Sequence, residues 1–96
     1  MNLSPAHKQR LREIAWRSIR HALQHQSQLE ITDLDHVSPL LAQTGASFVS
    51  LHKHHKLRGC VGSLEAERPL IVDVNYNAYA AAFTDQRFPS VVAEEL

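Results

Sequence analysis

The sequence contains a single cysteine, Cys60, among its 96 residues. One thiol excludes an internal disulfide framework and favours a reducing compartment. The ten basic and ten acidic residues leave no net charge, so the basic excess that is usual for nucleic-acid binders is missing. Apolar runs are far too short to span a membrane, and Met1 to Pro5 shows no secretory signal. We therefore expect a cytoplasmic protein with no nucleic-acid and no membrane partner.

The chain has the size and composition of one small folded domain. Hydrophobic residues make up 44% and charged residues 21%, as in globular proteins. A chain of this size buries roughly two-thirds of its unfolded surface, which is enough for one modest core. One hairpin provides few strands for a sheet, and the last residues, Val91 to Leu96, follow a proline-containing loop without a stop signal. We expect residues 1–96 to form a single partial domain.

Two amphipathic helices are predicted. Ser4 is a suitable N-cap and Pro5 a suitable first residue for a helix that runs to about Gln24, with its arginines on a solvated face. Pro69 opens the second helix, which ends before Asp85 and Pro89. In the second helix, the alanine run at residues 80–82 allows close approach to a sheet, and Asp73 lies near the positive N-terminal end.

Between the helices, the sequence predicts a polar connection with a short helix near Leu40, followed by a β-hairpin. The strands are Ala46 to His52 and Leu57 to Leu64, joined around His54 and His55. A uniform register places Val49 opposite Cys60 and puts Val49, Leu51, Arg58 and Cys60 on one face. Neither face is strictly polar, which suggests a sheet covered on both sides. The predicted class is α+β: a β-hairpin of a mainly antiparallel sheet, flanked by two helices.

The segment around Cys60 is the first candidate site. Gly59 and Gly62 lie in the same strand, where glycines mark a bulge or a close approach of backbone or ligand. Arg58 is two residues from Cys60 and could lower the pKa of a nucleophilic thiol. The alternative is a small buried thiol with a packing role, and the sequence fixes no base partner for catalysis.

Two further groups of polar residues carry weaker signals. His52, His54 and His55 are read as a polar hairpin tip, because a structural metal site needs about four ligands; we expect no metal and no cofactor. After the second helix, Asp85 and Arg87 could form a pair beside Phe88, or Arg87 could present its guanidinium to an anion.

The ordered motifs from Phe48 onward resemble the AMMECR domain family, also called AmmeMemoRadiSam system protein A. The residues that carry the resemblance are Leu57-Arg58-Gly59-Cys60-Val61-Gly62-Ser63-Leu64, Arg68-Pro69-Leu70, Asn77-Ala78-Tyr79-Ala80-Ala81-Ala82-Phe83, Asp85-Gln86-Arg87-Phe88-Pro89 and Glu94-Glu95-Leu96. The resemblance implies an α+β domain of about twice this length, of which this chain is the N-terminal half. The chain departs from the family pattern at two places. The hairpin tip at His54 and His55 often carries glycine in the family, and Gln86 stands where proline is common.

The resemblance implies a role without a firmly established activity. Family members are encoded with, or fused to, Memo-like and radical-SAM proteins, which suggests an accessory or binding component of that system. The groove for a ligand or partner is then expected at Arg58, Gly59, Gly62, Asp85, Arg87 and Phe88. A thiol-dependent enzyme with Cys60 as nucleophile and Arg58 as anion anchor is the alternative, and a purely structural strand is the third. We also expect that an exposed sheet edge could form a homodimer.

Overall fold

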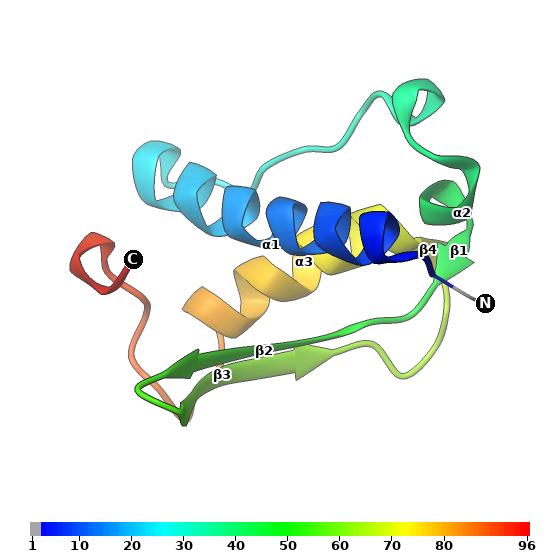
Figure 1. Ribbon diagram of the computed structural model, residues 1–96. Coiled ribbons are helices and arrows are strands. Elements are labelled where there is room, and N and C mark those ends of the chain that lie inside the picture. Colours follow the sequence, from blue (N-terminus) through cyan, green and yellow to red (C-terminus); the bar gives the residue numbers. More distant parts are fainter. Residues whose placement is uncertain (1–2) are drawn as a thin grey trace.

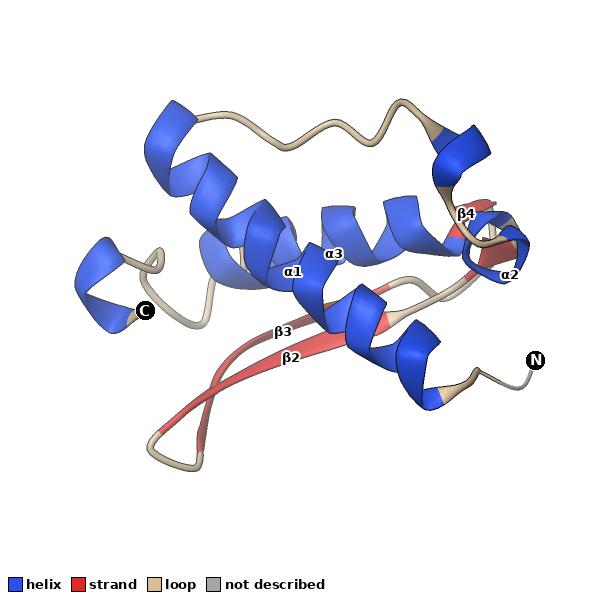
Figure 2. Ribbon diagram, turned by 45° about the horizontal axis from the view of Figure 1, so that its top comes forward, coloured by secondary structure: helices blue, strands red, loops and turns tan. Residues whose placement is uncertain are grey.

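The computed structural model describes residues 3–96 and has the predicted α+β class, with helices on one side of a β-hairpin (Figure 1 and Figure 2). The elements in chain order are α1 (Pro5–His25), the 3-10 turn η1 (Leu34–His36), α2 (Pro39–Ala42), β1 (Thr44–Gly45), β2 (Phe48–Lys53), β3 (Lys56–Gly62), β4 (Arg68–Pro69), α3 (Leu70–Phe83) and the 3-10 turn η2 (Ala93–Glu95). Within these residues, no helix is both long enough and apolar enough to cross a membrane.

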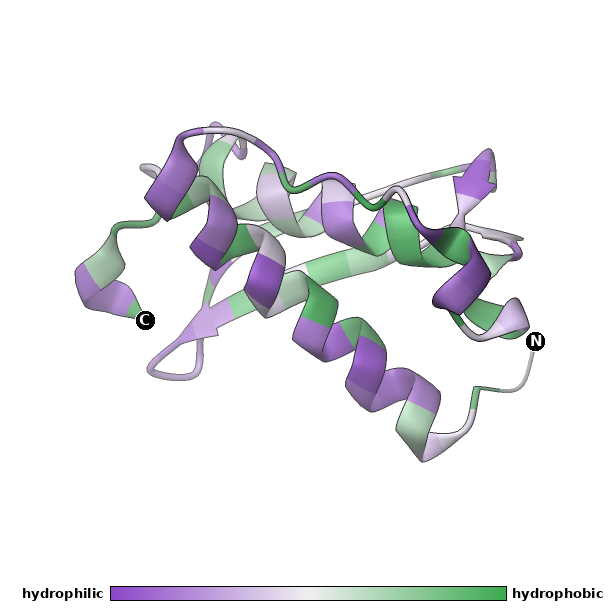
Figure 3. Cartoon of the chain, turned by 90° about the horizontal axis from the view of Figure 1, so that it is seen from above, coloured by the Kyte–Doolittle hydropathy of each residue, from purple (hydrophilic) through white to green (hydrophobic). Residues whose placement is uncertain are grey.

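Helix α1 begins and ends where its capping residues require. The Ser4 hydroxyl accepts a hydrogen bond from the His7 N–H at 3.1 Å, and Pro5 occupies the first turn. The helix ends at His25, and the capping residue Gln26 adopts a left-handed conformation with a φ of 56°. Its hydrophilic positions alternate with apolar ones along the ribbon (Figure 3). The prediction of a helix from Pro5 to about Gln24 is confirmed to within one residue.

Helix α3 is the centre of the domain, because it packs against α1 on one side and against the β2–β3 hairpin on the other (Figure 1). Its buried apolar residues are Leu70, Ile71, Val74, Ala78, Ala80, Ala81 and Ala82. Three polar residues, Asp73, Asn75 and Asn77, are buried with them. A helix between two layers must bury most of its circumference, so α3 lacks the wide polar face of α1.

The hairpin has the predicted turn but a different register. His54 and His55 form the two-residue turn and both have positive φ, at 52° and 66°. His52 lies opposite Leu57 as expected, but Arg58 has no partner in the ladder and Leu51 pairs with Gly59. Beyond this bulge Val49 lies opposite Val61, so the predicted pair of Val49 with Cys60 is wrong. The sequence pattern gives no sign of one extra residue in β3, which shifts every later pair.

The bulge also corrects the predicted faces of the hairpin. Val49 and Leu51 point toward α3, whereas Ser50 and Cys60 lie on the opposite face, with 3.2 Å between the Ser50 Oγ and the Cys60 Sγ. No other element of residues 3–96 covers that outer face, on which the Phe48 side chain is 67% exposed. The expectation of a sheet covered on both sides is therefore wrong for the described chain.

A second, very short sheet holds the start of α3 in place. β1 and β4 pair antiparallel, with Thr44 opposite Pro69 and Gly45 opposite Arg68. The Leu70 N–H continues this pairing by donating to the Gln43 carbonyl oxygen at 2.7 Å. The short helix predicted near Leu40 is confirmed as α2, which leads directly into this sheet. The segment before β2 is thus fixed to the N-terminal end of α3.

Candidate functional site

Arg58 is held by a carboxylate from the last turn of the chain. Its Nε and Nη2 donate to the two oxygens of Glu95, each at 2.9 Å, which is the bidentate geometry that guanidinium groups favour. Lys53 donates to the same carboxylate from the neighbouring strand at 3.2 Å. The remaining nitrogen, Nη1, is buried and has no hydrogen-bond partner within residues 3–96. The guanidinium predicted to anchor an anion is thus already paired with Glu95.

This pairing fixes the charge of Glu95. The Arg58 hydrogen bonds, helped by the Val92 N–H and by Lys53, lower the pKa of Glu95 to about 2. The same contacts raise the pKa of Arg58. Both groups therefore keep their charges at neutral pH, and the pair fastens η2 to the bulge in β3.

Cys60 is tied to the loop after α3 through its backbone. Its N–H donates to the Asp85 Oδ2 at 3.0 Å, and the Arg87 Nε and Nη2 hold the same carboxylate at 3.0 and 2.8 Å. The Arg87 side chain and the Cys60 N–H together lower the pKa of Asp85 well below its usual range. The guanidinium of Arg87 also lies 5.4 Å from the centre of the Phe88 ring. The structure thus brings Cys60, Asp85, Arg87 and Phe88 together.

The two glycines allow close approach on opposite faces of β3. A Cβ atom at Gly59 would lie 2.1 Å from the Ala81 carbonyl oxygen of α3. At Gly62 it would lie 2.0 Å from a carbon of the Phe48 ring on the outer face. Gly59 therefore lets the backbone of the strand touch the backbone of the helix, as the alanine run predicted. Gly62 instead makes room for a side chain that is largely exposed.

Arg58 and Cys60 are separated in space despite their closeness in sequence. Arg58 lines a small cavity on the α1 side of the hairpin, next to Ile19 and Leu51. The Cys60 thiol contacts Ser50 on the outer face, and this hydroxyl is its hydrogen-bond partner in the described chain. The prediction that Arg58 and Cys60 share a face is wrong, because Arg58 is the residue that bulges out of the ladder.

The sequence reasoning missed a polar cluster around Asp73. This carboxylate is 1% exposed and accepts hydrogen bonds from the Ser47 N–H and hydroxyl at 2.7 Å each, the Ser63 hydroxyl at 2.7 Å and the Arg68 Nε at 2.8 Å. The Asn77 amide donates to it from the next turn at 3.1 Å. Burial alone would raise the pKa of Asp73, but the hydrogen bonds from Ser63, Arg68 and Ser47 together lower it. The cluster ties the starts of β2, β4 and α3 to the end of β3.

The signal for this cluster was present in the second helix. Asp73 and Asn77 are four residues apart and lie on one side of a helix that is otherwise apolar there. Asn75 is also buried, where its amide donates to the Leu29 carbonyl oxygen at 2.6 Å. The interpretation of Asp73 as a favourable charge near the helix N-terminus overlooked its burial. A buried carboxylate requires several donors, and these come from the residue before β2, the residue after β3, β4 and the next turn of α3.

The histidines of the hairpin tip lie in the exposed turn and the strand residues beside it. Across residues 3–96, no group of three or more His, Cys, Asp or Glu side chains is arranged to hold a metal ion. The structure therefore offers no set of side chains on which to build a metal centre. Near the hairpin, the groups that carry candidate chemistry are the Cys60 thiol and the Arg58–Glu95 and Asp85–Arg87 pairs.

Comparison with known proteins places this arrangement in a family. The AMMECR1 family model matches residues 12–96, which include both halves of the hairpin, α3 and the Arg58–Glu95 and Asp85–Arg87 pairs. The chain belongs to the AMMECR1 family. The resemblance inferred from the motifs is thereby confirmed.

Several archaeal proteins are similar to this chain. A protein of Sulfolobus acidocaldarius is 38% identical over 82 residues, which cover 80% of this chain and 36% of the relative. A protein of Saccharolobus solfataricus is 38% identical over 88 residues, or 88% of this chain and 37% of the relative. The crystal structure of an uncharacterized protein from Pyrococcus horikoshii matches with a TM-score of 0.79 and 30% identity. That match covers 88% of this chain and 43% of the solved one.

The chain therefore spans somewhat more than a third of the length of the curated relatives and less than half of the solved relative. The residues matched by the family model, 12–96, contain the whole candidate site. The fold and the family are shared over the matched part.

Proposed function

We propose that this AMMECR1 family chain is an accessory, binding component of a system that includes Memo-like and radical-SAM proteins. The binding surface would be the part of β3 at Cys60 and Gly62 together with Asp85, Arg87 and Phe88, since Arg58 and Gly59 face α1 and α3 instead. Support comes first from family membership, which the motifs around Cys60 and Arg87 carry. The second support is the geometry of the surface, which is fixed before any partner arrives.

One observation carries the proposal: Asp85 is held from both sides, by the Cys60 N–H of β3 and by the Arg87 side chain. The Arg87 side chain is nevertheless 58% exposed at the margin of the uncovered strand face. A guanidinium that is positioned by an internal carboxylate and still open to solvent suits the recognition of a partner. The exposed Phe48 ring on the same hairpin adds apolar area for contact.

The alternative function is a thiol-dependent enzyme with Cys60 as nucleophile. The half-buried thiol on an open face favours it, but a nucleophile requires a nearby base, and the partner of the thiol in the described chain is the Ser50 hydroxyl. The alkylation rate of Cys60 from pH 5 to 9, compared with a denatured control, separates the two functions. A plateau well below the ordinary thiol pKa of about 8.5 would favour the enzyme. Protection would indicate a packed thiol and leave the binding component and a purely structural strand to be separated by partner binding.

The direct test is binding to the Memo-like and radical-SAM proteins of the organism that encodes this chain. Each purified protein is titrated with the chain by calorimetry. We expect measurable binding to at least one of them and a loss of about tenfold in affinity for Arg87→Ala. Arg20→Ala is the matched control, since this arginine lies on the exposed side of α1. Cys60→Ser should bind like the wild type. Absence of binding to both proteins, or full binding by Arg87→Ala, would refute the proposal.

A further inference from the structure

A hollow of about 420 Å³ lies between α1 and Leu29 of the segment that follows this helix. Six residues of α1 line it: Arg10, Glu13, Arg17, Arg20, His21 and Gln24. Successive positions in this set are mostly three or four apart, so these side chains lie on one face of the helix. The hollow thus gathers three of the arginines that the sequence assigned to a solvated face.

The shape of the hollow is set by contacts between α1, the segment after it and α3. Helix α1 ends at His25, and the left-handed Gln26 turns the chain back along the helix. The carbonyl oxygen of Leu29 then accepts a hydrogen bond of 2.6 Å from the amide of Asn75, a buried residue of α3. Leu29 is therefore held beside α1 by a contact that involves neither edge of the hairpin.

Two of the basic side chains in the hollow are positioned by aromatic rings. The guanidinium carbon of Arg20 lies 5.9 Å from the centre of the Trp16 ring. The centres of the His21 and His25 rings are 4.5 Å apart. Side chains that are already ordered lose less conformational entropy when they bind a ligand.

The hollow carries an excess of positive charge. Arg10 pairs with Glu13 at 3.3 Å, and this glutamate is the only carboxylate of the lining. Arg17 and Arg20 form no ion pair with any carboxylate of residues 3–96. Cations one turn apart on a helix repel each other, and an anion bound between these two arginines would remove the repulsion.

The donors of the hollow indicate which anion it would accept. Arg17 and Arg20 each present a planar guanidinium, which can hold two oxygens of one group. His21 supplies a ring N–H in either protonation state. A phosphate monoester has three terminal oxygens and a charge of about −2 at neutral pH, which matches two permanent cations and a further donor. A carboxylate, with a single charge on two oxygens, would leave part of this set unpaired.

We propose that this hollow binds the phosphate group of a small, soluble phosphate monoester, with Arg17 and Arg20 as its two cations and His21 as a further donor. The volume of the hollow lies within the range of sites for small molecules. The site shares no residue with the surface around Arg87, so the inference does not depend on the proposed function.

The test is a titration of the isotopically labelled chain with glycerol 3-phosphate, followed by NMR at about pH 7.5, where the monoester is a dianion. We expect saturable shifts of the Nε–H signals of Arg17 and Arg20, with a dissociation constant of about 1 mM or lower. Acetate, titrated at the same ionic strength, should bind at least about tenfold more weakly. Equal affinities for acetate and glycerol 3-phosphate would overturn the proposal, as would shifts that never saturate.

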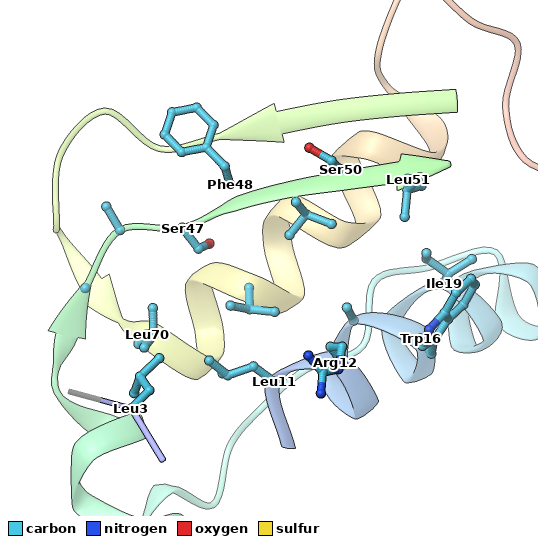
Figure 4. A pocket seen from close by; sticks show the side chains of 15 residues that line it. Leu3, Leu11, Arg12, Trp16, Ile19, Ser47, Phe48, Ser50, Leu51 and Leu70 are labelled. Atoms are coloured by element: carbon cyan, nitrogen blue, oxygen red, sulfur yellow. The ribbon is translucent and has the colours of Figure 1, made fainter. Parts of the chain in front are cut away.

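Arg17→Gln should weaken the binding of glycerol 3-phosphate about tenfold, because it removes one guanidinium from the hollow. Arg12→Gln is the matched control, since Arg12 is an exposed arginine of the same helix that lines the apolar groove between α1 and β2 instead (Figure 4). Both arginines are exposed, so both variants should keep the wild-type stability in urea. An equal loss of affinity in the two variants would show that the phosphate follows the overall charge of α1 and would refute the inference.

Vesicles of phosphatidylcholine that contain phosphatidic acid test the other source of a phosphate monoester. The chain should not sediment with them, because Leu29 is the only apolar side chain of the hollow and offers too little area to insert into a bilayer. Co-sedimentation that Arg17→Gln abolishes would assign the site to a lipid headgroup and contradict the proposal.

Discussion

The two edges of the β2–β3 hairpin are treated in opposite ways by the rest of the chain. On β3, the Cys60 N–H is occupied by Asp85, and the ladder is interrupted by the bulge at Arg58. On β2, the N–H and C=O groups of Phe48 and Ser50 alternate with those bonded to β3 and face the apolar groove between α1 and β2. The loop after α3 thus closes one edge with charged side chains, while no loop in residues 3–96 reaches the other.

The difference between the two edges explains how the candidate site forms. Charged side chains and bulges protect a strand edge against pairing with another strand. At β3 the same charges, Asp85 and Arg87 on one side and Arg58 with Glu95 on the other, also form the candidate site. The edge of β3 is therefore polar and preorganised, whereas the edge of β2 adjoins apolar side chains.

The largest effect should come from the face of β3 that touches α3. Gly59→Val places a side chain against the Ala81 carbonyl oxygen, and neither backbone can move without separating the hairpin from the helix. We expect loss of cooperative unfolding in a urea titration. Gly62→Val should cost only about 1–2 kcal/mol, because the Phe48 ring that it meets is exposed and can turn away.

Cys60→Ala is the control for both glycine variants, since it changes the same strand without adding volume. Its free energy of unfolding should lie within about 1 kcal/mol of that of the wild type. Equal stability of Gly59→Val and Gly62→Val would show that the two faces of β3 are not different in the way the structure indicates.

The second effect concerns the cluster that anchors the beginning of β2 and the end of β3. Asp73→Asn removes the negative charge that Ser47, Ser63 and Arg68 surround, and should cost about 2–4 kcal/mol at pH 7. Because the pKa of Asp73 is lowered in the folded state, its contribution is complete above the unfolded pKa of about 3.9 and is lost as the pH falls through the folded value.

Urea titrations from pH 7 to pH 2 check both parts of this prediction. The wild type should lose stability as the pH falls below about 4, and Asp73→Asn should show a shallower dependence on pH. Glu65→Gln is the control, as an exposed acidic residue of the loop before β4. A variant that loses no stability at pH 7 would mean that the cluster does not anchor the hairpin.

The third prediction concerns the edge of β3 that Asp85 covers. Asp85→Ala removes the acceptor of the Cys60 N–H, so this amide should exchange with solvent about tenfold faster. The amide of Val61, which lies in the ladder with Val49, should keep its rate. Glu94→Ala, a change at an exposed acidic residue nearby in sequence, should alter neither rate. Unchanged exchange at Cys60 in Asp85→Ala would show that the β3 edge is protected by something other than Asp85.

Local features of this fold could be predicted from the sequence, because their causes lie within a few residues. Ser4 and Pro5 start α1, and the His54–His55 turn follows from the spacing of two short strands. The pairing of Asp85 with Arg87 is equally local, since the two residues are two apart. Motif order was sufficient to identify the family and with it the α+β class.

The remaining features depend on contacts between distant segments, which a sequence pattern does not encode. Arg58 meets Glu95 across 37 residues, and Ser47 meets Asp73 across 26. The bulge at Arg58 follows from the same ion pair and from the contact of Gly59 with α3, both of which need the folded chain. Without the bulge, the register assigned Cys60 to the wrong face.

The smallest effect lies in the turn that joins the two edges. His54 and His55 both adopt the left-handed region that glycine and asparagine enter at lower cost. His55→Gly should therefore raise the free energy of unfolding by about 0.5–1 kcal/mol, since the relief of strain exceeds the entropy that glycine adds to the unfolded chain. His52→Gly, at a position in β2, should instead lower it by a similar amount. Thermal melting of both variants measures whether stability rises for His55→Gly and falls for His52→Gly. A loss of stability in His55→Gly would contradict a strained turn. A gain would show that the histidine side chains, rather than the turn they form, are the source of the strain, since glycine adopts the same positive φ angles and keeps the register of the ladder.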